Sequence, residues 1–132
     1  MHKGFLIFGI LFGGLAVALG AFGTHGLQNL NVNEKNIYIF QIAMQYQMYH
    51  ALALLAVAII FERIPTPLIK WAGNFFVIGI ILFSGSLYIL TLIKILGKDN
   101  LTGIVIVTPI GGISFIVGWI LFLIGAIRYK KP

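Results

Sequence analysis

The sequence predicts an all-α, polytopic membrane protein whose four transmembrane helices form an up-down-up-down antiparallel bundle. The chain is 60% hydrophobic and only 9% charged, whereas a soluble domain carries roughly 25% charged residues. Its charged residues divide it into four uncharged runs, each close to the ~20 residues that cross a ~30 Å hydrocarbon core. Because lipid offers the backbone no hydrogen-bond partners, each run is expected to be helical.

We expect a single domain, residues 1–132, with helices at about residues 4–23, 38–61, 69–94 and 101–128. The first run exceeds the ~7–15 residues of a signal-peptide core, so it is expected to be a retained helix. Residues 24–39 form the longest connection. The next connection contains Pro65 and Pro67 and must be an ordered turn or extended. Short connections favour antiparallel neighbours.

The distribution of Lys and Arg predicts the orientation. One side of the predicted bundle holds Lys3, Arg63, Lys70, Arg128, Lys130 and Lys131, and the other holds Lys35, Lys94 and Lys98. Since the richer side faces the cytoplasm, both termini should be cytoplasmic, in the plasma (inner) membrane. The net charge of +6 then suits contact with anionic lipid headgroups. The sequence lacks the basic face of a nucleic-acid-binding protein, so we expect no nucleic-acid partner.

Small residues recur on one face of the first and fourth helices, where they predict close helix packing. In the first helix they are Gly9, Gly13, Ala16 and Gly20, and in the fourth they are Gly111, Ser114 and Gly118. Packing within the bundle and packing between protomers both remain open.

Polar side chains on all four helices are expected at a similar depth, in the half of the bundle away from the termini. Such residues are costly in membranes and call for an explanation. The candidate site comprises His25, Gln45, Tyr46, Tyr49, His50, Ser84, Ser86, Tyr88 and Thr108. His50 lies about ten residues into its helix, roughly 15 Å deep. The cluster could serve interhelical hydrogen bonding, a ligand pocket or water-filled cavity, or catalysis.

Several kinds of chemistry lack the residues they need. Cysteine is absent, and the three carboxylates, Glu34, Glu62 and Asp99, all lie in predicted connections. His25 and His50 alone fall short of the three or four strong ligands of a zinc site. We therefore expect no metal, no cofactor and no catalytic residues, and the sequence favours a non-enzymatic protein.

Four segments resemble a known family: Gly20–Leu27, Gln45–Leu54, Phe83–Tyr88 and Thr108–Gly112. They are similar, in order, to the motifs of small membrane proteins catalogued as domain of unknown function 423, which includes transmembrane-protein-256-like proteins. Thr24 stands where members often carry Ala. The resemblance implies four membrane helices and a bacterial plasma-membrane location, and it implies no established activity.

Three functions therefore remain open. The first is a non-enzymatic membrane protein whose polar cluster binds or passes a small molecule. The second is a structural or accessory subunit that associates, as a homo-oligomer or with another membrane protein, through its small-residue faces. The third is an intramembrane enzyme that uses its histidines. Membrane lipids are the expected partners in each case.

Overall fold

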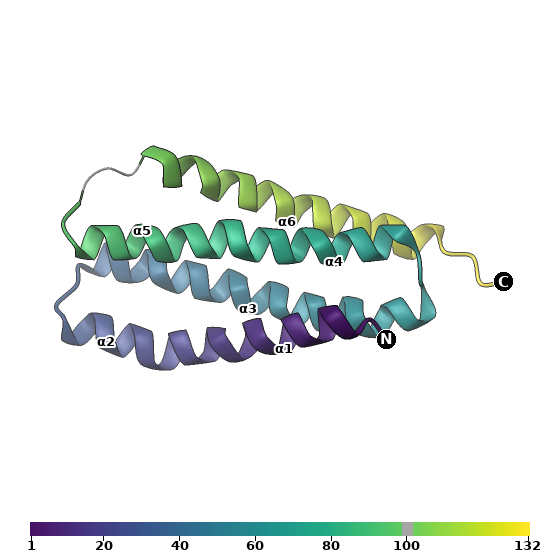
Figure 1. Ribbon diagram of the computed structural model, residues 1–132, viewed down its shortest axis with the longest axis horizontal. Helices are drawn as coiled ribbons and strands as arrows, with labels where there is room; N and C mark the ends of the chain where they lie inside the picture. The colour runs from purple at the N-terminus through teal and green to yellow at the C-terminus, as the bar shows by residue number, and fades with distance from the viewer. Residues whose placement is uncertain (99–101) are drawn as a thin grey trace.

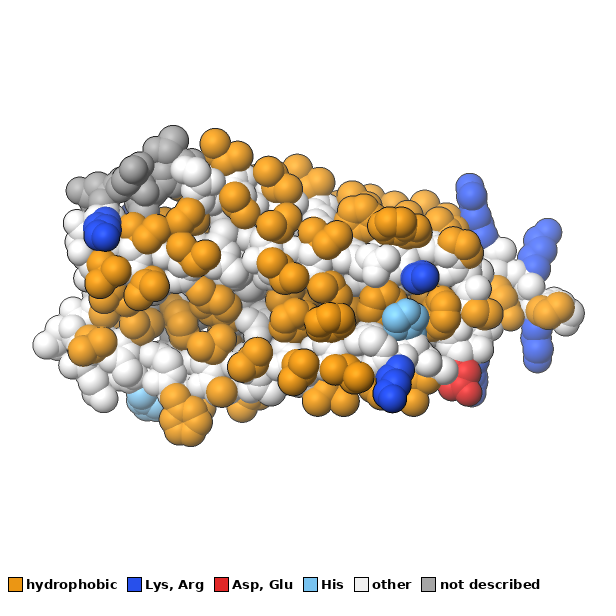
Figure 2. All heavy atoms as spheres, viewed as in Figure 1, with side chains coloured by type: hydrophobic (Ala, Val, Ile, Leu, Met, Phe, Trp, Pro, Cys, Tyr) orange, Lys and Arg blue, Asp and Glu red, His pale blue; other side chains and the backbone are white. Residues whose placement is uncertain are grey.

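A computed structural model describes residues 1–98 and 102–132 of the chain. Within them lie four helical segments long and apolar enough to cross a membrane. The segments lie side by side in chain order, and both termini are at the same end (Figure 1). Hydrophobic side chains cover much of the visible surface, and most of the visible Lys and Arg side chains lie at the end that carries the termini (Figure 2).

The first segment runs through α1 (Lys3–Ala18), a π-helical turn η1 (Leu19–Gly23) and α2 (Thr24–Asn29). It begins where His2 Nδ1 accepts a hydrogen bond from the Phe5 amide at 3.2 Å. It continues six residues beyond the expected end at residue 23, because no proline interrupts Thr24–Asn29 and the single Gly26 does not end the helix. The chain turns at Asn31, whose φ of 54° is left-handed.

The second segment is a single helix, α3 (Glu34–Arg63), which starts four residues before the expected position. Asn33 explains the early start, since its Oδ1 accepts a hydrogen bond from the Lys35 amide at 3.0 Å and caps the helix. The helix ends before Pro65. The next segment begins with Pro67 in its first turn, a position where the missing amide hydrogen costs nothing.

The third segment comprises α4 (Pro67–Gly79), the π-helical turn η2 (Ile80–Ser84) and α5 (Gly85–Ile95). The fourth is α6 (Thr102–Arg128), which contains Pro109. Its expected start at residue 101 lies outside the described residues. The most extensive contacts pair α1 with α3 and α4 with α6, and α3 joins the two pairs by packing on α4 and α5.

Glycines allow the helices within each pair to approach closely. A Cβ on Gly9 would lie 2.7 Å from the Leu55 side chain of α3, and one on Gly118 would lie 2.7 Å from the Phe76 ring of α4. A Cβ on Gly111 would meet the backbone of Phe83 in η2. Gly13 and Gly20 also face α3, and Ala16 is fully buried. The small-residue faces of α1 and α6 are thus occupied within the chain.

The apolar core is concentrated in the part of the bundle toward the termini. Its fully buried members include Leu54, Val57, Ile69 and Phe76, and Phe5 crosses from α1 to reach Gly73 of α4. The buried polar side chains of Gln47, Ser84, Ser86 and Thr91 lie farther along the bundle, toward the end away from the termini.

Candidate functional site

Gln47 is the centre of the buried polar contacts, and it links three helical segments. Its side chain is 4% exposed. Its Nε2 donates to the Phe12 carbonyl of α1 at 2.8 Å, and its Oε1 accepts from the Tyr88 hydroxyl of α5 at 2.7 Å. Both ends of the amide are therefore satisfied by direct contacts. Gln47 was not among the residues that the sequence singled out.

His50 lies one helical turn from Gln47 and connects α3 to α6. Its Nδ1 is 2.8 Å from the Tyr46 carbonyl, which can only accept, so Nδ1 carries the hydrogen. Its Nε2 accepts from the Trp119 indole at 3.1 Å. The ring stacks on Phe115 with the centroids 3.6 Å apart. His50 is therefore a neutral imidazole with both nitrogens engaged, and acting as a base would require breaking the Trp119 bond.

Hydroxyl groups join the remaining helices in the same part of the bundle. Ser84, fully buried, donates to the Ala43 carbonyl of α3 at 2.7 Å. Ser86 and Thr108 share a hydrogen bond of 2.6 Å between α5 and α6. Ser114 donates to the Phe75 carbonyl of α4 at 2.9 Å. Within the described residues, every buried side-chain nitrogen or oxygen has a partner. The interior thus contains hydrogen-bonded helix contacts.

The structure brings together only part of the predicted cluster. His50, Ser84, Ser86, Tyr88 and Thr108 lie in the interior contacts described above. Three others do not join them: His25 is exposed on α2, and Gln45 and Tyr49 are exposed on the far side of α3 from Gln47. Tyr46 is 40% exposed at the edge of a groove.

That groove runs between α3 and α6 and opens to the outside of the bundle. Its volume is about 490 Å³, within the ~300–1,000 Å³ typical of small-molecule sites. Aromatic and apolar side chains dominate its wall. It is lined by Tyr46, His50, Phe83, Pro109, Gly112, Ile113, Phe115, Ile116 and Trp119. Among the described residues the Tyr46 hydroxyl has no hydrogen-bond partner, so it is the group in this wall with unused bonding capacity.

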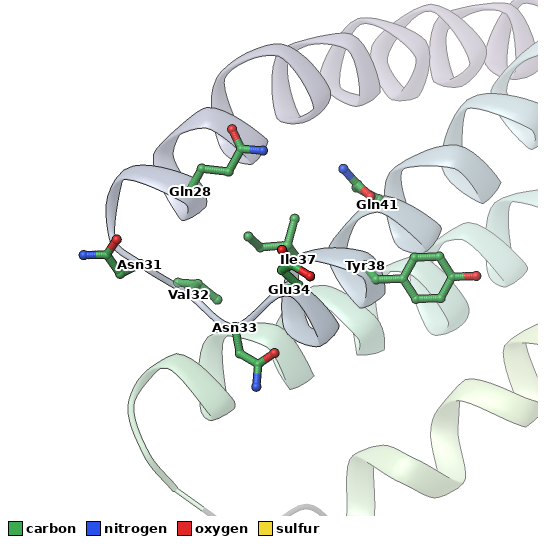
Figure 3. A pocket seen from close by; sticks show the side chains of 8 residues that line it. All are labelled: Gln28, Asn31, Val32, Asn33, Glu34, Ile37, Tyr38 and Gln41. Atoms are coloured by element: carbon green, nitrogen blue, oxygen red, sulfur yellow. The ribbon is translucent and has the colours of Figure 1, made fainter.

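A second hollow, of about 670 Å³, lies between α2 and the start of α3, at the end away from the termini (Figure 3). Gln28 of α2 and Gln41 of α3 lie on opposite sides of it. Its other lining residues are Asn31, Val32, Asn33, Glu34, Ile37 and Tyr38. Amides dominate its polar groups, and Glu34 supplies the one carboxylate among its lining residues. This hollow is therefore hydrophilic and carries a single negative charge.

Metal-ligating side chains do not gather in the part of the chain that is described. No group of three or more His, Cys, Asp or Glu is close enough there to hold a metal ion. The two histidines that were weighed as possible metal ligands differ in environment, since His25 is exposed on α2 and His50 is buried against Phe115.

Comparisons with known proteins agree on one family. A family profile described as "Protein of unknown function (DUF423)" matches residues 19–112. A UPF0382 membrane protein of Staphylococcus saprophyticus is 44% identical, over 96% of this chain and 98% of its own length. The UPF0382 membrane protein YwdK of Bacillus subtilis is 42% identical, with the same coverage.

A relative from Escherichia coli matches a similar share of the chain. The UPF0382 inner membrane protein YgdD of Escherichia coli K12 is 40% identical, over 96% of this chain and 91% of its own length. No solved structure matches the chain.

Proposed function

The chain belongs to the DUF423 family of membrane proteins, and we propose that it is a non-enzymatic protein that binds a lipid-like molecule in the groove between α3 and α6. The observation that carries this proposal is the groove itself, an aromatic-lined hollow of about 490 Å³. It opens toward the lipid, so a ligand would enter from the bilayer.

The groove wall defines the chemistry of the ligand. Phe83, Phe115 and Trp119 offer apolar and aromatic surface, which favours an acyl chain or a flat hydrophobic ring. The nitrogens of His50 and Trp119 bond to each other or to the backbone, so neither has a spare hydrogen to donate. The Tyr46 hydroxyl remains available. The proposed ligand is therefore largely apolar with one hydrogen-bonding group.

The interior supports binding over passage. A conducted solute needs a water-filled or polar path, but Gln47, Tyr88 and the buried serines bond directly to one another or to the backbone. Opening such a path would break these bonds in a low-dielectric interior, where unpaired polar groups are costly.

A photoreactive probe tests the proposal. Purified protein in phosphatidylcholine vesicles is irradiated with a diazirine-bearing fatty acid, and labelled residues are identified by mass spectrometry. Labelling should concentrate at Tyr46 and Trp119, above the level at Leu11 and Leu15, which are each 54% exposed on α1. Equal labelling of both surfaces would mean ordinary contact with bulk lipid and would reject the proposal.

A pair of glycine variants supplies the matched control. A Cβ on Gly112 would meet only the Phe83 ring, at 3.8 Å or more, so Gly112→Leu should fold and fill the groove. Gly14 of α1 has open space beside it, and Gly14→Leu adds the same side chain elsewhere. We expect Gly112→Leu to lower groove labelling about tenfold, equivalent to about 1.4 kcal/mol of binding free energy. Gly14→Leu should leave it unchanged.

We also propose that both termini face the cytoplasm. Six Lys and Arg residues lie at the end of the bundle with the termini and three at the other, and the richer side is normally cytoplasmic. The chain has no cysteine, so Asn33→Cys and Lys131→Cys provide single labelling sites. A membrane-impermeant maleimide added to intact cells should label the first and not the second. The reverse pattern would invert the orientation.

A further inference from the structure

The outward face of α3 carries a regular seam across the membrane. Its positions follow alternating steps of four and three residues and are Tyr38, Ile42, Gln45, Tyr49, Leu52, Ala56 and Ile59. We call this set the α3 seam. Such a 3.5-residue repeat is typical of two helices that coil around each other. From first to last it extends about 32 Å, which matches the ~30 Å hydrocarbon core.

No helix in the described part of the chain covers the α3 seam. Tyr38, Tyr49, Leu52 and Ile59 are 62%, 56%, 57% and 59% exposed. Gln45 is also exposed, and Ile42 and Ala56 are half-buried. α1 packs on the side of α3 that carries Ala51 and Leu55, and the third segment contacts the side with Ala43. The seam therefore faces the surroundings of the bundle.

The α3 seam carries polar atoms that hydrocarbon cannot satisfy. Gln45 is about 10 Å along the helix from Tyr38, which places its amide inside the hydrocarbon core. Within the described residues neither this amide nor the Tyr49 hydroxyl has a hydrogen-bond partner in the chain, whereas Gln47 on the opposite side uses both ends of its amide. Acyl chains offer no donors or acceptors, so an unpaired amide there is costly. A protein surface fits this face better than lipid.

We propose that a second copy of this chain packs on the α3 seam, with the two α3 helices parallel about a two-fold axis normal to the membrane. Two copies with the same orientation bring Gln45 against Gln45 at equal depth. A carboxamide both donates and accepts, so two glutamines complement each other. A single polar residue in an apolar seam also fixes register and oligomeric state. No charged residue lies between Lys35 and Glu62 to oppose the pairing.

The small residues of α1 and α6 that were predicted to pack closely are already used within the bundle. Gly9 and Gly20 of α1 already contact α3, and Gly111 and Gly118 of α6 already contact η2 and α4. Gly14, Ala18 and Ala21 of the first helical segment form a second exposed face, but that face carries no polar side chain in need of a partner, whereas the α3 seam carries Gln45 and Tyr49. This inference does not depend on the ligand proposed for the groove.

Cysteine crosslinking in vesicles tests the pairing directly, because the natural chain contains no cysteine. Leu52→Cys is placed on the seam, and Leu11→Cys on α1 and Ile120→Cys on α6 are controls with 54% and 49% exposure. The three positions lie 11, 8 and 8 residues from helix ends on the same side of the bundle. Their depths therefore agree within about one helical turn.

Purified full-length variants are reconstituted in phosphatidylcholine vesicles at high dilution and oxidised with copper phenanthroline. We expect a disulfide-linked dimer for Leu52→Cys and monomers for both controls. Equal dimer yields at all three positions would indicate random collision, and no dimer at any position would indicate a monomer. Either result would overturn the proposal.

A second variant tests the role of the amide. Gln45→Leu, combined with Leu52→Cys, should lower dimer yield roughly three- to tenfold across a dilution series in lipid, as expected for one or two lost interhelical hydrogen bonds. Because the Gln45 amide has no hydrogen bond to another helix among the described residues, the variant should fold normally, with unchanged helix content and melting temperature of the monomer. An unchanged dimer yield would overturn the Gln45 pairing.

Discussion

The two sides of α3 carry similar side chains in opposite situations. On the inner side, Gln47 and His50 are buried, and their polar atoms bond to α1, α3 itself, α5 and α6. On the outer side, Gln45 and Tyr49 are exposed, and within the described residues their polar atoms bond to no other helix. The same residue type thus fixes the fold on one side and remains available for a partner on the other.

The largest expected effect follows from removing the inner amide. Gln47→Leu removes two hydrogen bonds and leaves the Tyr88 hydroxyl without its acceptor. We expect the free energy of unfolding to fall by about 2–3 kcal/mol, since a buried unpaired group adds its desolvation cost. The free energy of unfolding is measured in mixed micelles, where the protein is diluted to a monomer. Gln45→Leu is the control and should change the value by less than about 0.5 kcal/mol.

An intermediate effect is expected at His50. His50→Phe keeps a ring against Phe115 but deprives the Trp119 indole of its acceptor. We expect a loss of about 1–2 kcal/mol and a blue shift of Trp119 fluorescence, recorded in a Trp71→Phe background. Tyr49→Phe, a change on the outer side, should alter neither quantity. A shift of equal size in both variants would contradict the distinction between the two sides.

The smallest effect is expected at Ser84. Ser84→Ala removes the 2.7 Å bond to the Ala43 carbonyl. That carbonyl keeps its partner within the α3 helix, so no acceptor is left unpaired. We expect a loss of about 1 kcal/mol, the usual net value of one hydrogen bond. Equilibrium unfolding as for Gln47→Leu measures it, and a loss as large as that of Gln47→Leu would mean that Ser84 has a further role in packing.

The sequence predicted the membrane spans because charge alone divides the chain. Lys, Arg and carboxylates are excluded from hydrocarbon, so the uncharged runs mark the helices. The ends were less accurate: Thr24–Asn29 continues the first helical segment, and Asn33 starts α3 early. Both differences depend on local backbone bonding, which hydrophobicity does not report.

Which side of α3 packs inside the bundle was harder to predict. In water a polar stripe marks the outside of a helix, but in lipid both the interior and the surroundings are apolar. Gln41, Gln45 and Tyr49 follow four-residue steps on the outer side, and spacing alone does not distinguish this stripe from the residues that pack inward. A usable signal was present in Ala43, Ala51 and Ala58, whose small side chains mark the packed face, with Gln47 between the first two.

The pairing of helices through glycine also bears on how the chain reaches the membrane. The most extensive contacts join α1 to α3 and α4 to α6, and each pair comes from consecutive spans. The first hairpin can therefore complete its packing in the bilayer while the ribosome is still translating the second. Contacts between the hairpins, such as Ser84 with Ala43 and Phe5 with Gly73, must await insertion of the third span.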